Sequence, residues 1–340
     1  MTRTLKAIIS IVIVFTIVIA GTFFLNFRPV NSSDSEIIRV GIPQNSTTSD
    51  IGQILLDKGL IRNKLAFKIL ARTKKVAADL GTGTYDLSKS MNMNEIINKI
   101  ASGEQTGDLK FTVPEGSEIV QMAEILKGLG MKDIDKFLEL TKNPSNYISD
   151  YPFLNDIPKG ASLEGYLYPA TYYLTDEDIS NPDAIIRMML DNFSTHFTDE
   201  IIEAGKNKGL GINQIVTLAS LVEREAQVDT DRPLVSAVFQ NRIKKDMYLE
   251  SCASVQYIIG ERKPVLSLED TDIDSPYNTY RNGGLPPSPI ASPGVKSLEA
   301  AVHPADVDYL FFIAKGDGTH IFSSTFDEHL KVQKEIQNAD

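Results

Sequence analysis

The sequence predicts an α+β protein that is tied to a membrane by a single N-terminal helix. Three observations support this prediction: an uncharged N-terminal run, a duplicated strand–helix pattern in the first half, and helix-period segments from residue 182 onward. The chain has 340 residues, of which 42% are hydrophobic and 23% are charged. It is therefore long enough to form two folded units, each with its own core.

Composition excludes several classes of function. The net charge of −11 argues against a nucleic-acid partner, because no basic face is available to neutralise phosphates. The single cysteine, Cys252, excludes an intrachain disulfide. The four histidines show no spacing typical of metal ligands. We therefore expect no metal and no other cofactor.

The N-terminal run covers residues 7–25, which are 19 residues without a charge. As a helix, such a run crosses about 30 Å of hydrocarbon. Arg3 and Lys6 precede it, and this basic flank is expected to stay in the cytoplasm with the rest of the chain outside. The alternative is a signal peptide cleaved near Ala20 and Gly21. The apolar run continues through Leu25, which favours an uncleaved anchor in the cell membrane.

After a polar linker at residues 26–36, a sequence pattern occurs twice. Residues 40–60 align without a gap with residues 111–131, and the serines Ser46 and Ser117 coincide. Both copies indicate a strand, a proline, a serine N-cap, an amphipathic helix and a terminal glycine. Each copy is expected to lead to a second strand, at residues 83–85 and 164–166. The alternative is a pair of similar but unrelated strand–helix elements.

Helical spacing dominates the second half of the chain. We predict helices at residues 184–193, 200–208, 214–226 and 234–245, and the last two are expected to pack against each other. Two further strands, at residues 309–314 and 320–322, should form a hairpin, followed by a helix at residues 325–336.

The helix predicted at residues 214–226 places two carboxylates, Glu223 and Glu225, within a broad apolar arc. A carboxyl group in apolar surroundings binds its proton more tightly, as a general acid near neutral pH requires. The alternative is that these side chains lie at the margin of the arc and pair with Arg224 or another cation. The helical pattern does not choose between the two carboxylates.

Residues 275–294 contain five prolines and three glycines, so they form neither a helix nor a central strand. Tyr277, Asn278 and Tyr280 offer flat rings and an amide, which suit a sugar-binding loop. The alternative is a rigid surface crossover.

Several motifs, in this order, resemble the endolytic murein transglycosylases, the YceG-like family. They are LEGYLYPATYYL (163–174), LASLVEREA (218–226), VFQNRI (238–243), residues 275–294, and AAVHP (300–304). The resemblance runs from residue 37 to the C-terminus. It implies a membrane-anchored enzyme that cuts nascent peptidoglycan strands internally. The expected organisation is a cytoplasmic tail (1–6), an anchor (7–25), a linker (26–36), a LysM-like subdomain (37–107) and a catalytic domain (108–340).

The resemblance also implies that Glu223 is the catalytic acid and base, with Glu225 in a supporting role. Glu223 would protonate the bond between N-acetylmuramic acid (MurNAc) and N-acetylglucosamine (GlcNAc). It would then take a proton from the 6-hydroxyl as that oxygen closes onto C1, which leaves a 1,6-anhydro end. Five side chains are expected to line the cleft: Tyr277, Asn278, Tyr280, Glu164 and Gln256. Glu164 could equally be a buried structural carboxylate.

One segment departs from the family pattern. Residues 249–255 read LESCASV, with Cys252 and Ala253 where many members have Asp-Pro. We therefore assign no catalytic role to this position, and Cys252 is interpreted as a packing residue.

Two other functions remain open: a lysozyme-like muramidase and a non-catalytic glycan-binding adaptor. The expected partners are peptidoglycan strands, the cytoplasmic membrane and peptidoglycan synthases.

Overall fold

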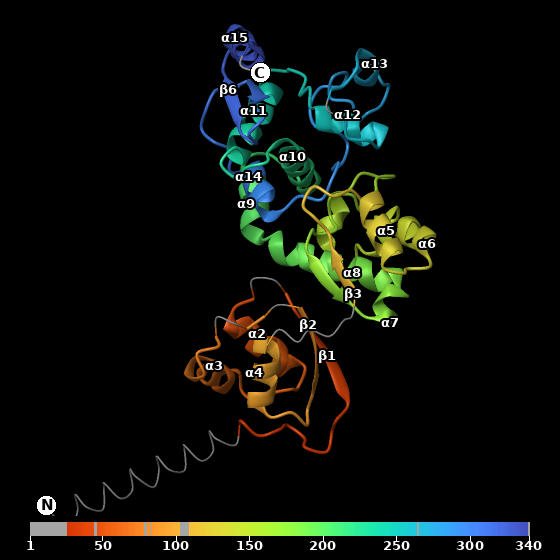
Figure 1. Cartoon of the computed structure of the whole chain (residues 1–340), viewed down its shortest axis with the longest axis vertical. Helices are drawn as coiled ribbons and strands as arrows, with labels where there is room; N and C mark the ends of the chain where they lie inside the picture. The colour runs from red at the N-terminus through yellow and green to blue at the C-terminus, as the bar shows by residue number, and fades with distance from the viewer. Residues whose placement is uncertain are drawn as a thin grey trace, which may run out of the picture. The chain divides into compact units, whose positions relative to one another are not determined.

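The computed structural model describes residues 26–43, 46–77, 80–81, 83–102, 109–263 and 265–338. The predicted cytoplasmic tail and anchor, residues 1–25, lie outside this part. None of the helices in the described ranges is long and apolar enough to cross a membrane. The chain forms two compact units, one of Met1–Lys110 with Tyr172–Asp176 and one of Phe111–Thr171 with Glu177–Asp340 (Figure 1).

The first unit packs helices against a small antiparallel sheet. Its elements are β1 (Ile37–Ile42), α2 (Thr48–Asp57), α3 (Lys64–Thr73), β2 (Gly83–Ser88) and α4 (Met93–Ser102). Alternate strand residues point to opposite faces of a sheet. The cross-strand partners Val40 and Tyr85 are both fully buried, whereas Ile37 is exposed. The helices therefore cover one face of this sheet, and their apolar residues complete the core.

The second unit is mainly helical, and two more two-stranded sheets accompany it. Its strands, together with β4 at the boundary between the units, are β3 (Leu109–Thr112), β4 (Thr171–Leu174), β5 (Phe311–Ala314) and β6 (His320–Ser323). Its longer helices are α5 (Ile119–Gly128), α6 (Ile134–Thr141), α8 (Pro182–His196), α9 (Asp199–Asn207), α10 (Ile212–Glu225), α11 (Arg232–Lys244), α12 (Cys252–Ile259), α14 (Val295–Val302) and α15 (Phe326–Gln337). Short turns of helix are η1 (Pro144–Asn146), η2 (Pro152–Asp156), α7 (Asp176–Ile179) and α13 (Leu268–Thr271).

The duplicated pattern is present in the backbone. In both copies the serine donates to the carbonyl oxygen of the proline three residues earlier, at 2.8 Å from Ser46 and 2.6 Å from Ser117. Both helices end at a glycine with positive φ, Gly59 and Gly130. Both then lead to a second helix, α3 or α6, and a second strand, β2 or β4. The repeat is therefore a strand–helix–helix–strand unit, which is longer than the sequence indicated.

Two details of the repeat were predicted wrongly. The helices are capped by Thr47 and Glu118, one residue after the predicted serines. The serine hydroxyls close the preceding turn instead, which leaves the next residue to begin the helix. The second strand of the later copy is also not at residues 164–166, where Gly165 has a φ of +86° and forms a turn. That strand begins at Thr171.

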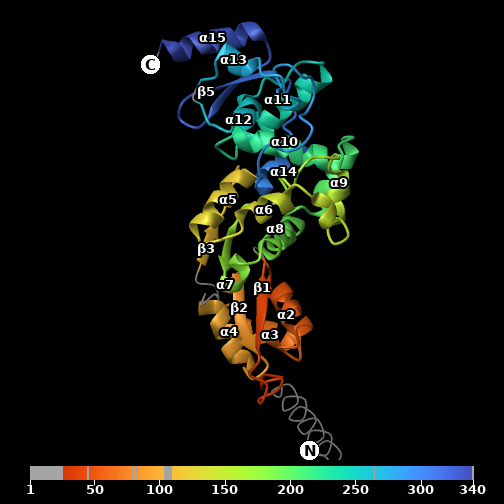
Figure 2. The same ribbon diagram turned by 90° about the vertical axis from the view of Figure 1, so that its right-hand side faces the viewer.

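Helix α10 is the centre of the second unit. It contacts α9, α11, α12, α14 and η2, and it lies beside α14 in both Figure 1 and Figure 2. Even Thr217 and Ser220, on its polar side, are fully buried. Neighbours on all sides therefore hold this helix in place.

The other helices of this unit agree with the predicted ranges. The predictions at residues 184–193, 200–208, 214–226 and 234–245 match α8 to α11 within three residues at each end. The contact between α10 and α11 is confirmed. The hairpin and the last helix are also present, but β5 begins at Phe311, two residues later than predicted. Residues 275–294 form neither helix nor strand.

Candidate active site

Glu223 lies near the C-terminal end of α10, and its side chain is only 5% exposed. Its Oε1 accepts a hydrogen bond from Nη1 of Arg232 at 2.9 Å. Its Oε2 accepts one from the backbone N–H of Gly294 at 3.0 Å. Both carboxyl oxygens are therefore held by donors from different segments, and the orientation of the group is fixed.

Arg232 is the first residue of α11, after the short turn that follows α10. Its Nε donates to Oδ1 of Asp229 at 3.1 Å, and Nη2 lies 4.0 Å from Oε2 of Glu115. Nη1 also donates to Oγ of Ser297 at 2.6 Å. Three carboxylates, those of Glu223, Asp229 and Glu115, thus surround the Arg232 guanidinium. Among the described residues, however, no group of acidic, histidine or cysteine side chains is arranged to hold a metal ion.

Gly294 is held against Glu223 by the proline-rich loop. The N–H of Ile290 donates to Oγ of Ser220 on α10 at 3.1 Å. Ser292 exchanges two backbone hydrogen bonds with residues 116–117, at 2.8 and 2.9 Å. These main-chain contacts fasten the loop to α10 and to the turn before α5, and so they position the Gly294 N–H.

Glu115 provides a second carboxyl group beside Glu223. A Cβ atom at residue 294 would lie 1.9 Å from Oε1 of Glu115, so a larger residue there would have to displace this carboxyl group. Partial burial and the charge of Glu223 raise the pKa of Glu115. Tyr168 lies close by, and burial followed by the charge of Glu115 raises its pKa to about 12.

The other two charged residues at this end of α10 have partners of their own. Arg224 donates from Nη1 to Oε1 of Glu118 at 2.9 Å. Glu225 accepts a hydrogen bond from Oγ of Ser251 at 2.5 Å. The cation that pairs with Glu223 is therefore Arg232 and not Arg224.

Glu164 and Gln256, two of the predicted cleft residues, belong to the network around Arg224. Glu164 is 5% exposed and accepts the N–H of Ile119 at the start of α5, at 3.2 Å. Burial raises the pKa of Glu164 to about 8. Gln256 accepts from Nη2 of Arg224 at 3.5 Å and donates to the carbonyl oxygen of Lys263 at 2.8 Å. The contacts of both residues are structural, and their binding roles stay predictions.

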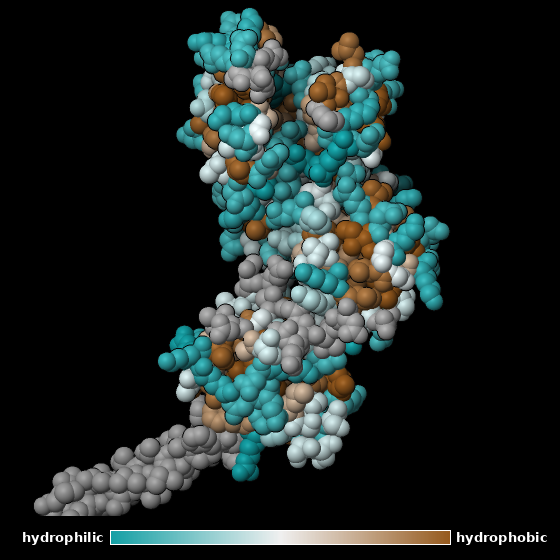
Figure 3. Space-filling model, viewed as in Figure 1, coloured by the Kyte–Doolittle hydropathy of each residue, from teal (hydrophilic) through white to brown (hydrophobic). Residues whose placement is uncertain are grey.

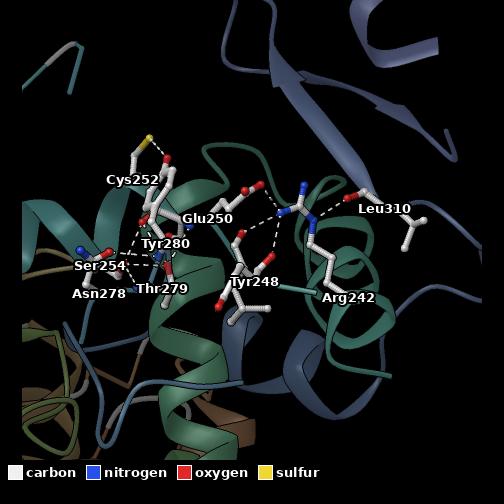
Figure 4. Close-up of polar contacts among 11 residues, drawn as sticks. Arg242, Tyr248, Glu250, Cys252, Ser254, Asn278, Thr279, Tyr280 and Leu310 are labelled. Carbon is white, nitrogen blue, oxygen red and sulfur yellow. Dashed lines mark hydrogen bonds and ion pairs between the residues drawn. The ribbon is translucent and has the colours of Figure 1, made fainter. Parts of the chain in front are cut away.

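The remaining predicted residues lie in the loop near α12. Asn278 is fully buried, and its amide donates to the carbonyl oxygens of Thr271 and Ile273 at 3.0 and 2.8 Å. Figure 4 shows the Tyr280 hydroxyl directed toward Cys252, with an O···S distance of 3.2 Å. The Tyr277 hydroxyl contacts that of Ser288. Asn278 holds the loop together, and the sugar-binding roles of the tyrosines stay predictions.

Comparison with known proteins identifies the family. The model of the YceG-like family matches residues 40–335. An endolytic murein transglycosylase of Bacillus subtilis is 35% identical over 331 residues, which cover 94% of this chain and 91% of that protein. The chain belongs to the YceG-like family. A second protein of that name, from Streptococcus pneumoniae, is 31% identical, with 95% of this chain and 63% of that protein covered.

A solved structure supports the fold of this YceG-like chain. The crystal structure titled as a yceG-like protein from Listeria monocytogenes is 34% identical, with a TM-score of 0.61. The match covers 87% of this chain and 99% of the other. The resemblance seen in the motifs is therefore confirmed.

Two depressions of this YceG-like chain meet at the Glu223 cluster. One, of about 710 Å³, begins at Pro114 and Glu115. The other, of about 530 Å³, is lined by Asp229, Val295 and residues of α8, α9, α11 and α14. Arg232 contacts a lining residue of each, Glu115 in the first and Asp229 in the second. Glu223 lines neither depression itself, and Arg232 connects it to a lining residue of each.

The sequence analysis missed Arg232 and Glu115. A signal existed for Arg232: a short turn between two packed helices brings the start of the second beside the end of the first. A signal also existed for Glu115. Where the first copy of the repeat has the uncharged pair Gln44-Asn45, the second has Glu115-Gly116, so only the second copy carries a carboxylate at this turn.

Proposed function

We propose that this chain is an endolytic murein transglycosylase, a lyase that cleaves MurNAc–GlcNAc bonds within peptidoglycan strands. The observation that carries the proposal is the Glu223 carboxyl group. It is 5% exposed, is held at both oxygens, and is connected through Arg232 to a lining residue of each of two depressions. The names of the Bacillus and Streptococcus relatives support the same activity.

A single carboxyl group can carry both proton transfers. Protonated Glu223 donates to the glycosidic oxygen as the bond from C1 to that oxygen breaks. The resulting carboxylate then takes the proton from the 6-hydroxyl of the same MurNAc, whose oxygen bonds to C1. The products are a 1,6-anhydro end and a free GlcNAc hydroxyl, and no water is consumed. Arg232 and the Gly294 N–H hold the carboxylate in place between the two steps.

The two depressions suit cleavage within a strand. An enzyme that cuts internally must hold sugars on both sides of the bond. Arg232 touches Glu115 in one depression and Asp229 in the other, so a strand lying across Glu223 has room in both directions.

A second candidate, a muramidase, is favoured by one observation. Hydrolysing glycosidases use two carboxyl groups, and Glu115 places a second one beside Glu223. In that case Glu115 would activate a water molecule, and the product would be a reducing end.

One digest separates these activities. Uncrosslinked peptidoglycan strands are treated with the full chain and with its Glu223→Gln variant, and the products are analysed by mass spectrometry. Anhydro ends from internal cuts, lost in the variant, are expected. Reducing ends would assign the muramidase activity. Binding without cleavage by either protein would overturn both enzymatic proposals in favour of an adaptor.

We extend the proposal to location and organisation. Residues 7–25 anchor the chain in the cell membrane, with residues 1–6 in the cytoplasm and the catalytic unit outside. The first folded unit is a LysM-like subdomain, and peptidoglycan synthases are partners. The charge pattern of the N-terminus and the repeat support these proposals. A truncated chain that starts at residue 37 should lose function in cells, and full function of that chain would contradict the anchor's role.

A further inference from the structure

A groove of about 710 Å³ runs from the turn before α5 along the surface of α5 and α6. Its wall is mostly apolar and includes Val120, Ile125 and Leu138. Val120, on this wall, is 56% exposed, so the apolar surface is open to a ligand. Figure 3 shows hydrophobic residues gathered over this part of the second unit.

The groove is continuous with the candidate active site. Glu115 lines the groove and also lies 4.0 Å from Arg232, which holds Glu223. A group that hangs from the sugar at the cleaved bond can therefore reach the groove directly.

A positive charge stands at the same end of the groove. Arg262 lines it, and its Nη2 reaches the carbonyl oxygen of Gly116 at 3.4 Å. The pKa of Arg262 is lowered, and the largest cause is the like charge of Arg224. Arg224 is itself paired with Glu118. Within the described residues, Arg262 forms no ion pair.

Arg224 and Arg262 repel each other, and Glu118 is the carboxylate that pairs with Arg224, while Glu115 and Glu124 also line the groove. Glu164 is the other acidic group beside Arg224, and its raised pKa of about 8 leaves it mostly uncharged at neutral pH. An added carboxylate at Arg262 would relieve the repulsion between the arginines.

We propose that this groove binds the peptide stem of the MurNAc unit at the cleaved bond, an inference that rests on the proposed function. A stem carries small apolar side chains and free carboxylates, and it is attached to the sugar whose C1 is attacked. Arg262 pairs with a stem carboxylate, and the alanine methyl groups lie on the wall formed by Val120, Ile125 and Leu138. The groove therefore makes the enzyme selective for strands that still carry their stems.

The test compares two substrates: uncrosslinked strands with their stems, and the same strands stripped by an amidase. The full chain in detergent should show a kcat/KM at least tenfold higher on stem-bearing strands, since one charge-assisted hydrogen bond corresponds to about 10- to 100-fold. Arg262→Gln and Val120→Asp should reduce this ratio to about one. Lys315→Gln removes a positive charge from the turn between β5 and β6, outside the groove lining, and should leave the ratio unchanged.

Binding of both substrates to the Glu223→Gln protein is measured alongside. The proposal would be overturned if the unmodified protein bound and cleaved the two substrates equally. It would also be overturned if the ratio of kcat/KM between the two substrates were unchanged in both groove variants. If neither substrate is cleaved, the proposed function fails, but the binding ratio still decides whether the groove takes stems. Tight binding of a protein partner that Val120→Asp abolishes, with no stem preference, would reassign the groove to that partner.

Discussion

Replacing Arg232 with methionine tests how far the active site depends on one buried ion pair. The Arg232 side chain is 8% exposed and that of Glu223 is 5% exposed. Methionine fills similar space but leaves the Glu223 carboxylate buried without a cation. Asp229 and Glu115 are 68% and 49% exposed, so water can replace Arg232 for both at little cost. Almost all the loss therefore comes from Glu223, and breaking a buried pair in this way costs about 3 to 5 kcal/mol.

The free energy of unfolding is measured by urea denaturation of the detergent-solubilised chain, followed by circular dichroism. Glu223→Gln should cost less than Arg232→Met, because no carboxylate is left unpaired and Arg232 keeps Asp229. The amide oxygen can replace only one of the two acceptors, so one of Arg232 and the Gly294 N–H loses its bond. The double variant, Arg232→Met with Glu223→Gln, should regain most of the loss. Arg281→Met breaks an exposed pair with Asp272 and should change stability by less than about 1 kcal/mol. A loss below about 1 kcal/mol for Arg232→Met, with no coupling in the double variant, would refute this reasoning.

Three further predictions follow from the same geometry. The pKa of Glu164 rises from 4.5 to about 8 on folding, so between these two pH values the folded chain keeps a proton that the unfolded chain has lost. The free energy of unfolding therefore falls as the pH rises from 4.5 to about 8. The full effect is on the order of 5 kcal/mol, and Glu164→Gln should flatten the fall in urea titrations at pH 5 and pH 9. Gly294→Ala must displace Glu115 or the loop, and kcat should fall at least tenfold. Gly283→Ala is the control, because nothing lies within 4 Å of its added Cβ, and it should keep full activity. Ser220→Ala leaves the buried Ile290 N–H without its acceptor and should cost about 1 to 3 kcal/mol in urea denaturation, and an unchanged midpoint would contradict this.

Most of the secondary structure could be predicted from the sequence, because its signals are local. Apolar spacing located α8 to α11, and the duplicated pattern located β1 with α2 and β3 with α5. The N-caps were misplaced by one residue, since the sequence does not show whether a serine hydroxyl turns forward to the helix or back to a proline carbonyl. The strand expected at residues 164–166 failed for a similar reason, because a turn at Gly165 depends on its neighbour Pro289.

The candidate site was harder to predict because its parts come from distant segments. The helix pattern reduced the choice to Glu223 and Glu225, and only the family motif separated them. Arg232, Glu115 and Gly294 meet at Glu223 through the packing of α10, α11 and two loops. No local pattern reports such a meeting. Tyrosine and asparagine side chains in the proline-rich loop suggested sugar contacts, whereas the structure uses Asn278 to hold the loop itself.

The proline-rich loop also has a consequence for mutational studies of this family. Four of the groups that it uses to build the site are main-chain groups: the N–H groups of Ile290, Ser292 and Gly294, and the carbonyl oxygen of Ser292. Alanine substitution at Ile290 or Ser292 leaves these main-chain groups in place, so it reports only on the side chains at those positions. Only changes that alter the course of the backbone, such as a deletion or an amide-to-ester replacement, would reveal how much the loop contributes.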